Sequence, residues 1–271
     1  MSTCNHQCDS CQTSCDQRSK PQPIFAPPHE QSHVGKVFGI VSGKGGVGKS
    51  MITCQLAVLL RRMGFRVGIL DADITGPSIP KAFTICSGMR SENEAIYPAR
   101  SVGGIEIASI NLLLEHETDP VLWRGPVITG MVDRFWSGLV WDVDYLLIDM
   151  PPGTGDVPLT VFTKIPLSGI FVVATPQELV SMVVEKSVQM AAKMEVPVLG
   201  LIENMSYINC PECGKIIYPF GKGKLNEAAK KHGLSVLARI PIDSALTDLV
   251  DQGNIEQFRG DWLSAAVERM R

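Results

Sequence analysis

The chain has 271 residues, of which 45% are hydrophobic and 20% charged, and its formal net charge is -3. This length and composition fit a globular domain of ordinary size, and the charge balance provides no general surface for nucleic acid or anionic membranes. Because the chain contains no long apolar run and no signal-like block near its start, we expect a cytoplasmic protein that binds neither nucleic acid nor membrane.

Residues 1–33 differ in composition from the rest. They are rich first in Cys, Ser, Gln and Asp and then in Pro, and they contain almost no core-forming residues. We interpret them as a flexible arm in front of a single domain at residues 34–271. The arm holds enough soft ligands to enclose one metal ion or one iron–sulfur cluster, and these are Cys4, Cys8, Cys11 and Cys15. The alternative is a disordered, reduced tail.

A glycine-rich loop lies between an apolar run at residues 37–41 and an amphipathic run that starts near Ile52. Glycines allow positive φ, and successive N–H groups can then form an anion nest at a helix N-terminus. The loop matches the P-loop pattern G-x-x-x-x-G-K-S, which predicts ATP binding. Lys49 would reach the β- and γ-phosphates, and the Ser50 hydroxyl would bind Mg²⁺. The predicted nucleotide-binding residues of the loop are Gly43, Lys44, Gly45, Gly46, Val47, Gly48, Lys49 and Ser50.

A second lysine, Lys44, stands directly after the first glycine of this loop. Its position resembles that of a lysine in the deviant P-loops of the MinD/ParA/nitrogenase iron protein class. The resemblance implies that Lys44 reaches across a dimer interface to the partner's nucleotide, with an electrostatic role like that of an arginine finger. A solvated lysine on an exposed loop is the alternative.

Two carboxylates, Asp71 and Asp73, follow the next apolar run at residues 65–70. Residues at the carboxyl ends of parallel strands face the ligand crevice in doubly wound sheets. By resemblance to deviant P-loop ATPases, Asp71 would help to organise the Mg²⁺ shell and Asp73 would orient the attacking water. A strand-end Asp can otherwise simply cap a helix.

The following stretch is predicted to be a rigid loop at residues 76–80, then irregular structure at 86–100 and a strand at 103–110. Residues 145–149 read Y-L-L-I-D, an apolar run that ends in a carboxylate. This is typical of a Walker B strand, so Asp149 should hold Mg²⁺ directly or through water. The loop P-P-G-T-G-D after it combines stiffness with glycine hinges, which suits a switch that senses the γ-phosphate.

Asn204 follows a further apolar run at residues 198–202. Its amide offers both a donor and an acceptor, so we expect it to hydrogen bond the adenine edge. Taken alone, an Asn at the end of a strand is usually a turn residue.

Cys210 and Cys213 form a C-P-E-C-G knuckle, which turns the backbone so that both thiolates point one way. A closed tetrahedral site needs four ligands, and the simplest source of the missing two is the same loop of a second subunit across a two-fold axis. The pattern therefore predicts a bridged metal site in a homodimer. A redox dithiol is the alternative, but no thioredoxin-like βαβ context precedes the knuckle.

Together these motifs resemble the Mrp/ApbC family of iron–sulfur cluster carrier ATPases over about residues 35–260. The matching stretches are Lys44, L-D-A-D at 70–73, W-R-G-P at 123–126, I-D-M-P-P-G-T-G-D at 148–156, E-N-M-S at 203–206 and C-P-E-C at 210–213. The resemblance implies a doubly wound, mostly parallel α/β sheet of the deviant Walker A type. It also implies a labile 4Fe–4S cluster held between the Cys210 and Cys213 pairs of two subunits, and a loop around Pro241 that closes over the adenine.

We therefore expect an ATPase that assembles or holds a 4Fe–4S cluster and transfers it to apo-proteins, with Lys44, Lys49 and Asp73 as the catalytic residues. A MinD- or ParA-like spatial organiser would need a membrane- or DNA-binding element, for which residues 261–271 are too short and too mixed in charge. An electron donor like the nitrogenase iron protein would need a stable, redox-active cluster. A zinc-bridged scaffold would differ in the metal.

Overall fold

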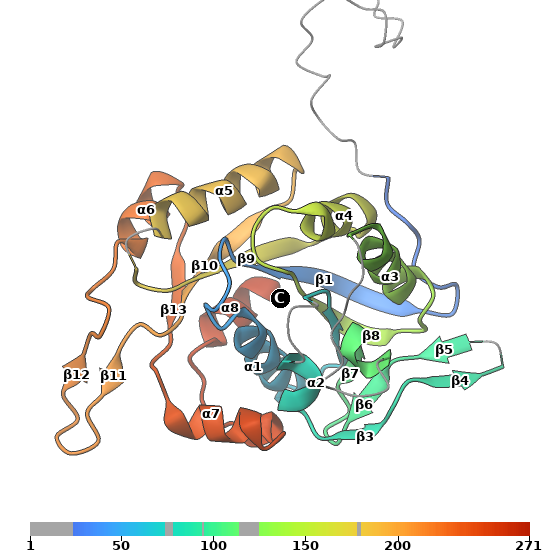
Figure 1. The fold of residues 1–271 in the computed structure, drawn as a ribbon, viewed down its shortest axis with the longest axis horizontal. Helices are drawn as coiled ribbons and strands as arrows, with labels where there is room; N and C mark the ends of the chain where they lie inside the picture. Colours follow the sequence, from blue (N-terminus) through green and yellow to red (C-terminus); the bar gives the residue numbers. More distant parts are fainter. Residues whose placement is uncertain (1–23, 74–77, 94, 114–124, 178–179) are drawn as a thin grey trace, which may run out of the picture.

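The structure is a computed structural model that describes residues 24–73, 78–93, 95–113, 125–177 and 180–271 (Figure 1). The strands are β1 (His33–Val41), β2 (Val67–Asp71), β3 (Ile85–Ser87), β4 (Arg90–Glu92), β5 (Ala95–Tyr97), β6 (Ala99–Ser101), β7 (Glu106–Ser109), β8 (Asp142–Asp149), β9 (Gly169–Ala174), β10 (Val198–Glu203), β11 (Ile208–Asn209), β12 (Ile216–Ile217) and β13 (Val236–Arg239).

The helices are α1 (Lys49–Arg62), α2 (Ser78–Ala82), α3 (Gly125–Ser137), α4 (Asp156–Lys164), α5 (Val180–Lys193), α6 (Leu225–Lys231), α7 (Ser244–Asp251) and α8 (Ser264–Met270). Two short 3₁₀ turns lie at Ile110–Leu113 and Ile255–Gln257. None of the helices in the described ranges offers an apolar stretch long enough to cross a membrane.

A nine-stranded sheet forms the centre of the molecule, in the order β13-β10-β9-β1-β8-β2-β7-β6-β3. The strands from β13 to β7 run parallel, and β6 and β3 extend the sheet in antiparallel fashion. All residues of β2 and β9 are buried, as expected for strands covered on both faces. The predicted doubly wound, mostly parallel α/β sheet is confirmed.

Two layers of helices cover the sheet (Figure 1). Helices α3, α4, α5 and α6 pack their apolar residues on one face, and α1, α2, α7 and α8 pack theirs on the other. The core therefore has two halves separated by the sheet. Because each half is closed by helices, ligands can reach the sheet only at its edges and at the ends of its strands.

The prediction of irregular structure over residues 86–100 is wrong. Part of the main sheet and the β4–β5 ribbon lie there, but each of these strands is only three residues long, too short to show an alternating pattern in the sequence. The rigid loop predicted at residues 76–80 is also replaced in part, because α2 begins at residue 78.

The last residues of the predicted arm are bound to the domain. The Ala26 N–H donates to the Lys164 carbonyl oxygen at 2.8 Å, and the Trp136 indole N–H donates to the Ala26 carbonyl oxygen at 2.8 Å. The Ser32 hydroxyl donates to the Leu139 carbonyl oxygen at 3.1 Å. This segment therefore leads directly into β1.

The functional residues gather where the chain reverses its direction along the sheet. Strand β1 lies between β8 and β9, and the P-loop leaves its carboxyl end. Asp71 and Asp149 end the next two strands in that direction and stand opposite each other in the β2–β8 register. A crevice outside the carboxyl ends of strands at such a switch point is the usual ligand site of this sheet type.

Candidate nucleotide site and cysteine hairpin

The P-loop has the backbone that a phosphate cradle needs. Gly46 and Gly48 adopt φ of 75° and 78°, in the left-handed region that favours glycine. At Gly48 a Cβ atom would lie only 2.2 Å from the Asn204 Nδ2 atom, so only glycine fits there without a shift. No side chain caps the start of α1, whose first N–H groups are therefore left for a ligand.

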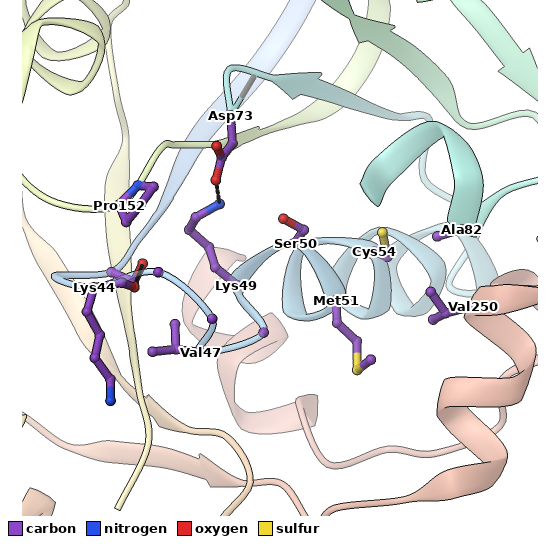
Figure 2. Close-up of a pocket in the computed structure, with 14 residues that line it drawn as sticks. Lys44, Val47, Lys49, Ser50, Met51, Cys54, Asp73, Ala82, Pro152 and Val250 are labelled. Atoms are coloured by element: carbon purple, nitrogen blue, oxygen red, sulfur yellow. Dashed lines mark hydrogen bonds and ion pairs between the residues drawn. The ribbon is translucent and has the colours of Figure 1, made fainter. Parts of the chain in front are cut away.

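A cavity of about 330 Å³ opens over this loop (Figure 2). Its lining includes the P-loop from Lys44 to Ser50, together with Asp73 and Pro152. This lining suits an anion, because P-loop glycines, Lys49 and the N-terminus of α1 all border the cavity.

Lys49 lies at the base of the cavity, with 5% of its side chain exposed. Its Nζ atom forms ion pairs with Asp149 Oδ1 at 2.8 Å and with Asp73 Oδ2 at 3.2 Å, the latter drawn in Figure 2. Burial alone would lower the pKa of Lys49, but the charges of Asp149 and Asp73 outweigh it and the pKa is raised. The lysine therefore stays charged, as a phosphate-binding cation must.

Asp149 is fully buried and collects hydroxyl donors from the first turns of α1. It accepts a hydrogen bond from Ser50 Oγ at 2.5 Å and another from Thr53 Oγ1 at 2.9 Å. Burial raises the pKa of Asp149, and the neighbouring Lys49, Ser50 and Thr53 oppose that rise. A hydroxyl and a carboxylate in direct contact provide the hard oxygen ligands that Mg²⁺ takes, so the residues present fit this ion.

Asp71 lies behind Asp149 and supports the site from within the sheet. It accepts a hydrogen bond from Ser109 Oγ at 2.8 Å and another from the Asp73 N–H at 3.2 Å. Burial, and then the charge of Asp149, raise the pKa of Asp71 well above its usual range. Asp71 is therefore placed to support the outer shell of a magnesium site.

Lys44 points away from Lys49 in Figure 2. Its Nζ atom hydrogen bonds to Gln177 Oε1 of the same chain, in the loop after β9. The predicted reach of Lys44 to a partner's nucleotide stays a prediction.

The loop after Asp149 is tied to the P-loop strand. The Gly153 N–H donates to the Ser42 carbonyl oxygen at 2.8 Å, and the Met150 N–H donates to the Ile40 carbonyl oxygen at 3.2 Å. Because Pro152 lines the cavity, this loop forms one of its walls. A change in the shape of the cavity would therefore act directly on this loop.

Asn204 is buried beneath the P-loop. Its Nδ2 atom donates to the Val47 carbonyl oxygen at 2.9 Å, so the amide supports the loop backbone. Pro241 is also buried, and the N–H of the next residue, Ile242, donates to the Tyr207 carbonyl oxygen at 2.8 Å. The roles of Asn204 and Pro241 at an adenine stay predictions.

Cys210 and Cys213 lie at the tip of a hairpin made by β11 and β12, which projects from one side of the molecule (Figure 1). The Cys210 N–H donates to the Lys215 carbonyl oxygen, and the Gly214 N–H donates to the Cys210 carbonyl oxygen, both at 2.9 Å. Cys210 is half-buried and Cys213 is exposed. Backbone N–H groups of Cys213 and Glu212 lower the pKa of Cys210, which favours its thiolate.

One copy of the chain brings too few ligands together at this hairpin to close a metal site. Among the described residues, no three His, Cys, Asp or Glu side chains are grouped so as to hold a metal ion. The four cysteines of the arm, Cys4, Cys8, Cys11 and Cys15, lie outside the described residues, and their predicted cluster stays a prediction.

A family model described as the NUBPL iron-transfer P-loop NTPase matches residues 33–269. The chain belongs to this family. The iron–sulfur cluster carrier protein of Clostridium perfringens is 46% identical to it over 235 residues, which cover 83% of this chain and 82% of the relative. That of Methanocaldococcus jannaschii is 42% identical over 260 residues, with 93% and 90% covered. The resemblance to iron–sulfur cluster carrier ATPases is thereby confirmed.

Solved structures agree with this membership of the iron-transfer NTPases. A nucleotide-binding protein from Archaeoglobus fulgidus, solved in complex with ADP, is 43% identical and superposes with a TM-score of 0.75, covering 85% of this chain and 91% of that one. MinD from Pyrococcus horikoshii, solved with Mg-ADP, has a TM-score of 0.54 at 20% identity, covering 88% and 95%. The likeness to MinD shows the fold alone.

Several side chains of this iron-transfer NTPase contact the site although no role was predicted for them. Thr53 stands four residues after Lys49, so helical spacing could have placed its hydroxyl beside the same carboxylate. Gln177 follows the end of β9, and Ser109 is the last residue of β7. Ligand-facing residues are expected at such strand ends. Glu203 of the E-N-M-S stretch lies outside the nucleotide site, and its ion-pair partner Arg239 is 36 residues away in sequence, so no local signal reveals that pair.

The two remaining described cysteines lie away from the hairpin. Cys54 is buried in α1, where burial and then the charges of Asp149 and Asp71 raise the pKa of its thiol well above the usual range. Cys86 is exposed in β3, with its Sγ atom 3.2 Å from the Arg100 carbonyl oxygen. These surroundings keep Cys54 a neutral thiol.

Proposed function

We propose that this protein is an ATP-hydrolysing iron–sulfur cluster carrier. Each subunit binds ATP at its P-loop, and two subunits hold one 4Fe–4S cluster between their Cys210 and Cys213 thiolates for transfer to apo-proteins. The observation that supports this proposal most is the pairing, in one chain, of a fully formed phosphate site with half of a metal site.

The side chains of the P-loop region then have distinct tasks. When ATP binds, Lys49 leaves Asp73 and Asp149 and pairs with the β- and γ-phosphates, because the phosphates carry the greater negative charge. Mg²⁺, held by Ser50 and Asp149 with Asp71 behind them, neutralises phosphate charge when it is bound. Asp73 lies at the cavity wall and orients the attacking water, while Lys44 contributes its charge to the partner's nucleotide.

The surroundings of the cysteine hairpin support a homodimer. Five large apolar side chains near the cysteines are each between 40% and 48% exposed, namely Ile216, Ile217, Tyr218, Phe220 and Ile242. Exposed apolar residues beside an incomplete ligand set are what a second copy of the chain would cover. Free thiols at such a surface persist in a reducing compartment, so we place the protein in the cytoplasm.

Anaerobic reconstitution with iron and sulfide tests this proposal. We expect about four bridged irons per dimer in the wild type, all of them lost in Cys210→Ala/Cys213→Ala. Cys86→Ala is the matched control, and its iron content should equal that of the wild type. The variant without Cys4, Cys8, Cys11 and Cys15 reports separately on a second cluster. Reconstituted protein should then activate an apo-protein that needs a 4Fe–4S cluster.

Zinc as the only metal bound, or iron that survives removal of Cys210 and Cys213 in the variant lacking the arm cysteines, would overturn the carrier proposal. A stable cluster that chelators and apo-proteins fail to remove would favour an electron donor instead.

A further inference from the structure

A buried carboxylate stands at the root of the cysteine hairpin. Glu203 is the last residue of β10 and is only 2% exposed. Its Oε2 atom accepts a hydrogen bond from Ser206 Oγ at 2.6 Å and another from Arg239 Nε at 3.1 Å. A buried carboxylate with a charged donor is held firmly in place.

Glu203 contacts both ends of the segment that carries the cysteines. Ser206 lies on the outgoing side, before β11, and Gly223 lies on the returning side, just before α6. A Cβ atom at Gly223 would lie 3.0 Å from Glu203 Oε1 and 3.1 Å from the Pro176 Cα atom. With a φ of 56° and no room for a side chain, Gly223 packs its backbone directly against the carboxylate.

The residue next to Glu203 supports the P-loop. Asn204 donates to the Val47 carbonyl oxygen at 2.9 Å. Successive residues at the end of a strand alternate in direction, which lets Glu203 contact the two ends of the hairpin segment while Asn204 contacts the P-loop. One stiff dipeptide therefore touches both functional regions.

Arg239, the last residue of the neighbouring strand β13, helps to hold Glu203 in place. Besides Glu203, it contacts Asn226 in α6, where its Nη2 atom donates to Oδ1 at 2.6 Å. The Ile240 N–H donates to the Glu203 carbonyl oxygen, and the Ser206 N–H donates to the Ile240 carbonyl oxygen, both at 2.8 Å. These bonds hold the root of the hairpin segment to the sheet.

We propose that Glu203 is a positioning residue that couples occupancy of the P-loop to the placement of Cys210 and Cys213. This inference rests on the proposed function and gives it a physical route. A nucleotide that moves the Val47 backbone displaces Asn204, and the adjoining Glu203 carries the displacement to Ser206 and Gly223 at the two ends of the hairpin segment. The loop after Asp149 bonds to the carbonyl oxygens of Ile40 and Ser42, at the start of the P-loop.

The test uses the metal-free full chain, so that it does not depend on cluster binding. Alkylation by iodoacetamide is followed peptide by peptide with mass spectrometry, with and without Mg-ATP. In the wild type we expect Mg-ATP to change the alkylation rates of Cys210 and Cys213 by about threefold or more. Exposed Cys86 is the internal reference and should react at one rate throughout.

Glu203→Gln keeps the shape of the side chain and removes its charge. We expect this variant to bind Mg-ATP as the wild type does, whereas the ratio of alkylation rates with and without Mg-ATP falls to about 1. Ser206→Ala removes one donor and should give an intermediate ratio. Because it deletes only a hydroxyl, it tests the inference even if Glu203→Gln does not fold.

Glu185→Gln is the matched control. Glu185 pairs with Lys231 of α6 at 3.0 Å, so the same chemical change is made at a carboxylate near the same helix but away from the hairpin root. This control should keep the wild-type ratio.

A wild type whose hairpin thiols do not respond to Mg-ATP would overturn the coupling, as would Glu203→Gln and Ser206→Ala variants that both keep the wild-type ratio. Loss of Mg-ATP binding in Glu203→Gln would also overturn it, because Glu203 would then support the nucleotide pocket itself. Iron content after reconstitution is measured separately. A chain that holds no cluster but shows the expected thiol ratios would refute the carrier function and keep the coupling.

Discussion

The phosphate site and the cysteine hairpin are built in opposite ways. Around Lys49 and Asp149, the polar groups are buried or part-buried and have partners from neighbouring strands or from α1. Around Cys213, the backbone is held by strands of two residues each, and the side chains are exposed. The first region is preorganised within one chain, whereas the second leaves its ligands open to an added molecule.

One chain thus combines a buried, fixed region with an exposed, open one. Buried charge networks are costly to disturb, which keeps the phosphate site in one geometry. An exposed pair of thiols costs little to rearrange, which suits the proposed release of a cluster.

Lys49→Met should cause the largest effect. Removing one electrostatic contact to the reacting phosphates should lower the rate of ATP hydrolysis by about a hundredfold or more. Phosphate release at saturating Mg-ATP measures this. Lys81→Met, at an exposed lysine 3.7 Å from Asp251, is the control and should keep the wild-type rate. Hydrolysis by Lys49→Met within a few-fold of the wild type would show that the buried network is not the catalytic site.

Gly48→Ala should destabilise the domain by about 1–3 kcal/mol, because a left-handed φ and contact with Asn204 both oppose a Cβ atom. Urea unfolding of the single variants and of Gly48→Ala/Asn204→Ala forms a double-mutant cycle. We expect Gly48→Ala to destabilise the domain less in the Asn204→Ala background, because the clash between the new Cβ atom and the Asn204 side chain is then absent. Equal costs in both backgrounds would mean that Asn204 does not shape the loop.

Arg66→Ala tests a region that should leave both sites untouched. Arg66 pairs with Asp142 and, at 2.6 Å, with Asp144, which lie at the opposite ends of the strands from the P-loop. Its hydrogen bonds lower the pKa of Asp144, so this pair stabilises the fold above the unfolded pKa of about 4 and loses its effect as pH falls through the lower folded value.

Because the pair is partly exposed, we expect Arg66→Ala to lower the urea midpoint only slightly at neutral pH, with the difference from the wild type shrinking below about pH 4. Urea midpoints measured across pH check this. A difference that grows as the pH falls would contradict the sign of the shift, and altered ATP hydrolysis would contradict the independence of this region.

Cys213→Ser should give the smallest effect on stability. The side chain is exposed at a hairpin tip, so the free energy of unfolding of the metal-free chain should change by about 0.5 kcal/mol or less. Urea unfolding of the reduced, metal-free protein is the measurement. A larger loss would show that the hairpin is structural, and the contrast between the two regions would then fail.

The sequence alone allowed the central part of this architecture to be predicted. Asp71 and Asp149 end apolar runs, and the parallel sheet brings such ends to one edge, where Asp71 stands opposite Asp149 and Asp149 pairs with Lys49. The P-loop is a contiguous motif whose glycines reveal its backbone. Local patterns of this kind need no knowledge of which strands become neighbours.

The rest depended on contacts between distant residues. The strands between Ile85 and Ser101 are too short to show a period, and their antiparallel pairing is set by the edge of the finished sheet. Glu203 finds Arg239 only because β10 pairs with β13. The contact of Lys44 with Gln177 likewise joins two loops that the sheet brings together.

The differing exposure of the thiols has a practical consequence for handling the protein in air. Oxidants attack accessible thiolates first, so Cys210 and Cys213 should be damaged while buried, neutral Cys54 beside the phosphate site is spared. A preparation purified aerobically should therefore hydrolyse ATP normally and yet fail to take up iron. Hydrolysis is thus a poor measure of integrity for this protein, and a free-thiol count should accompany every activity measurement.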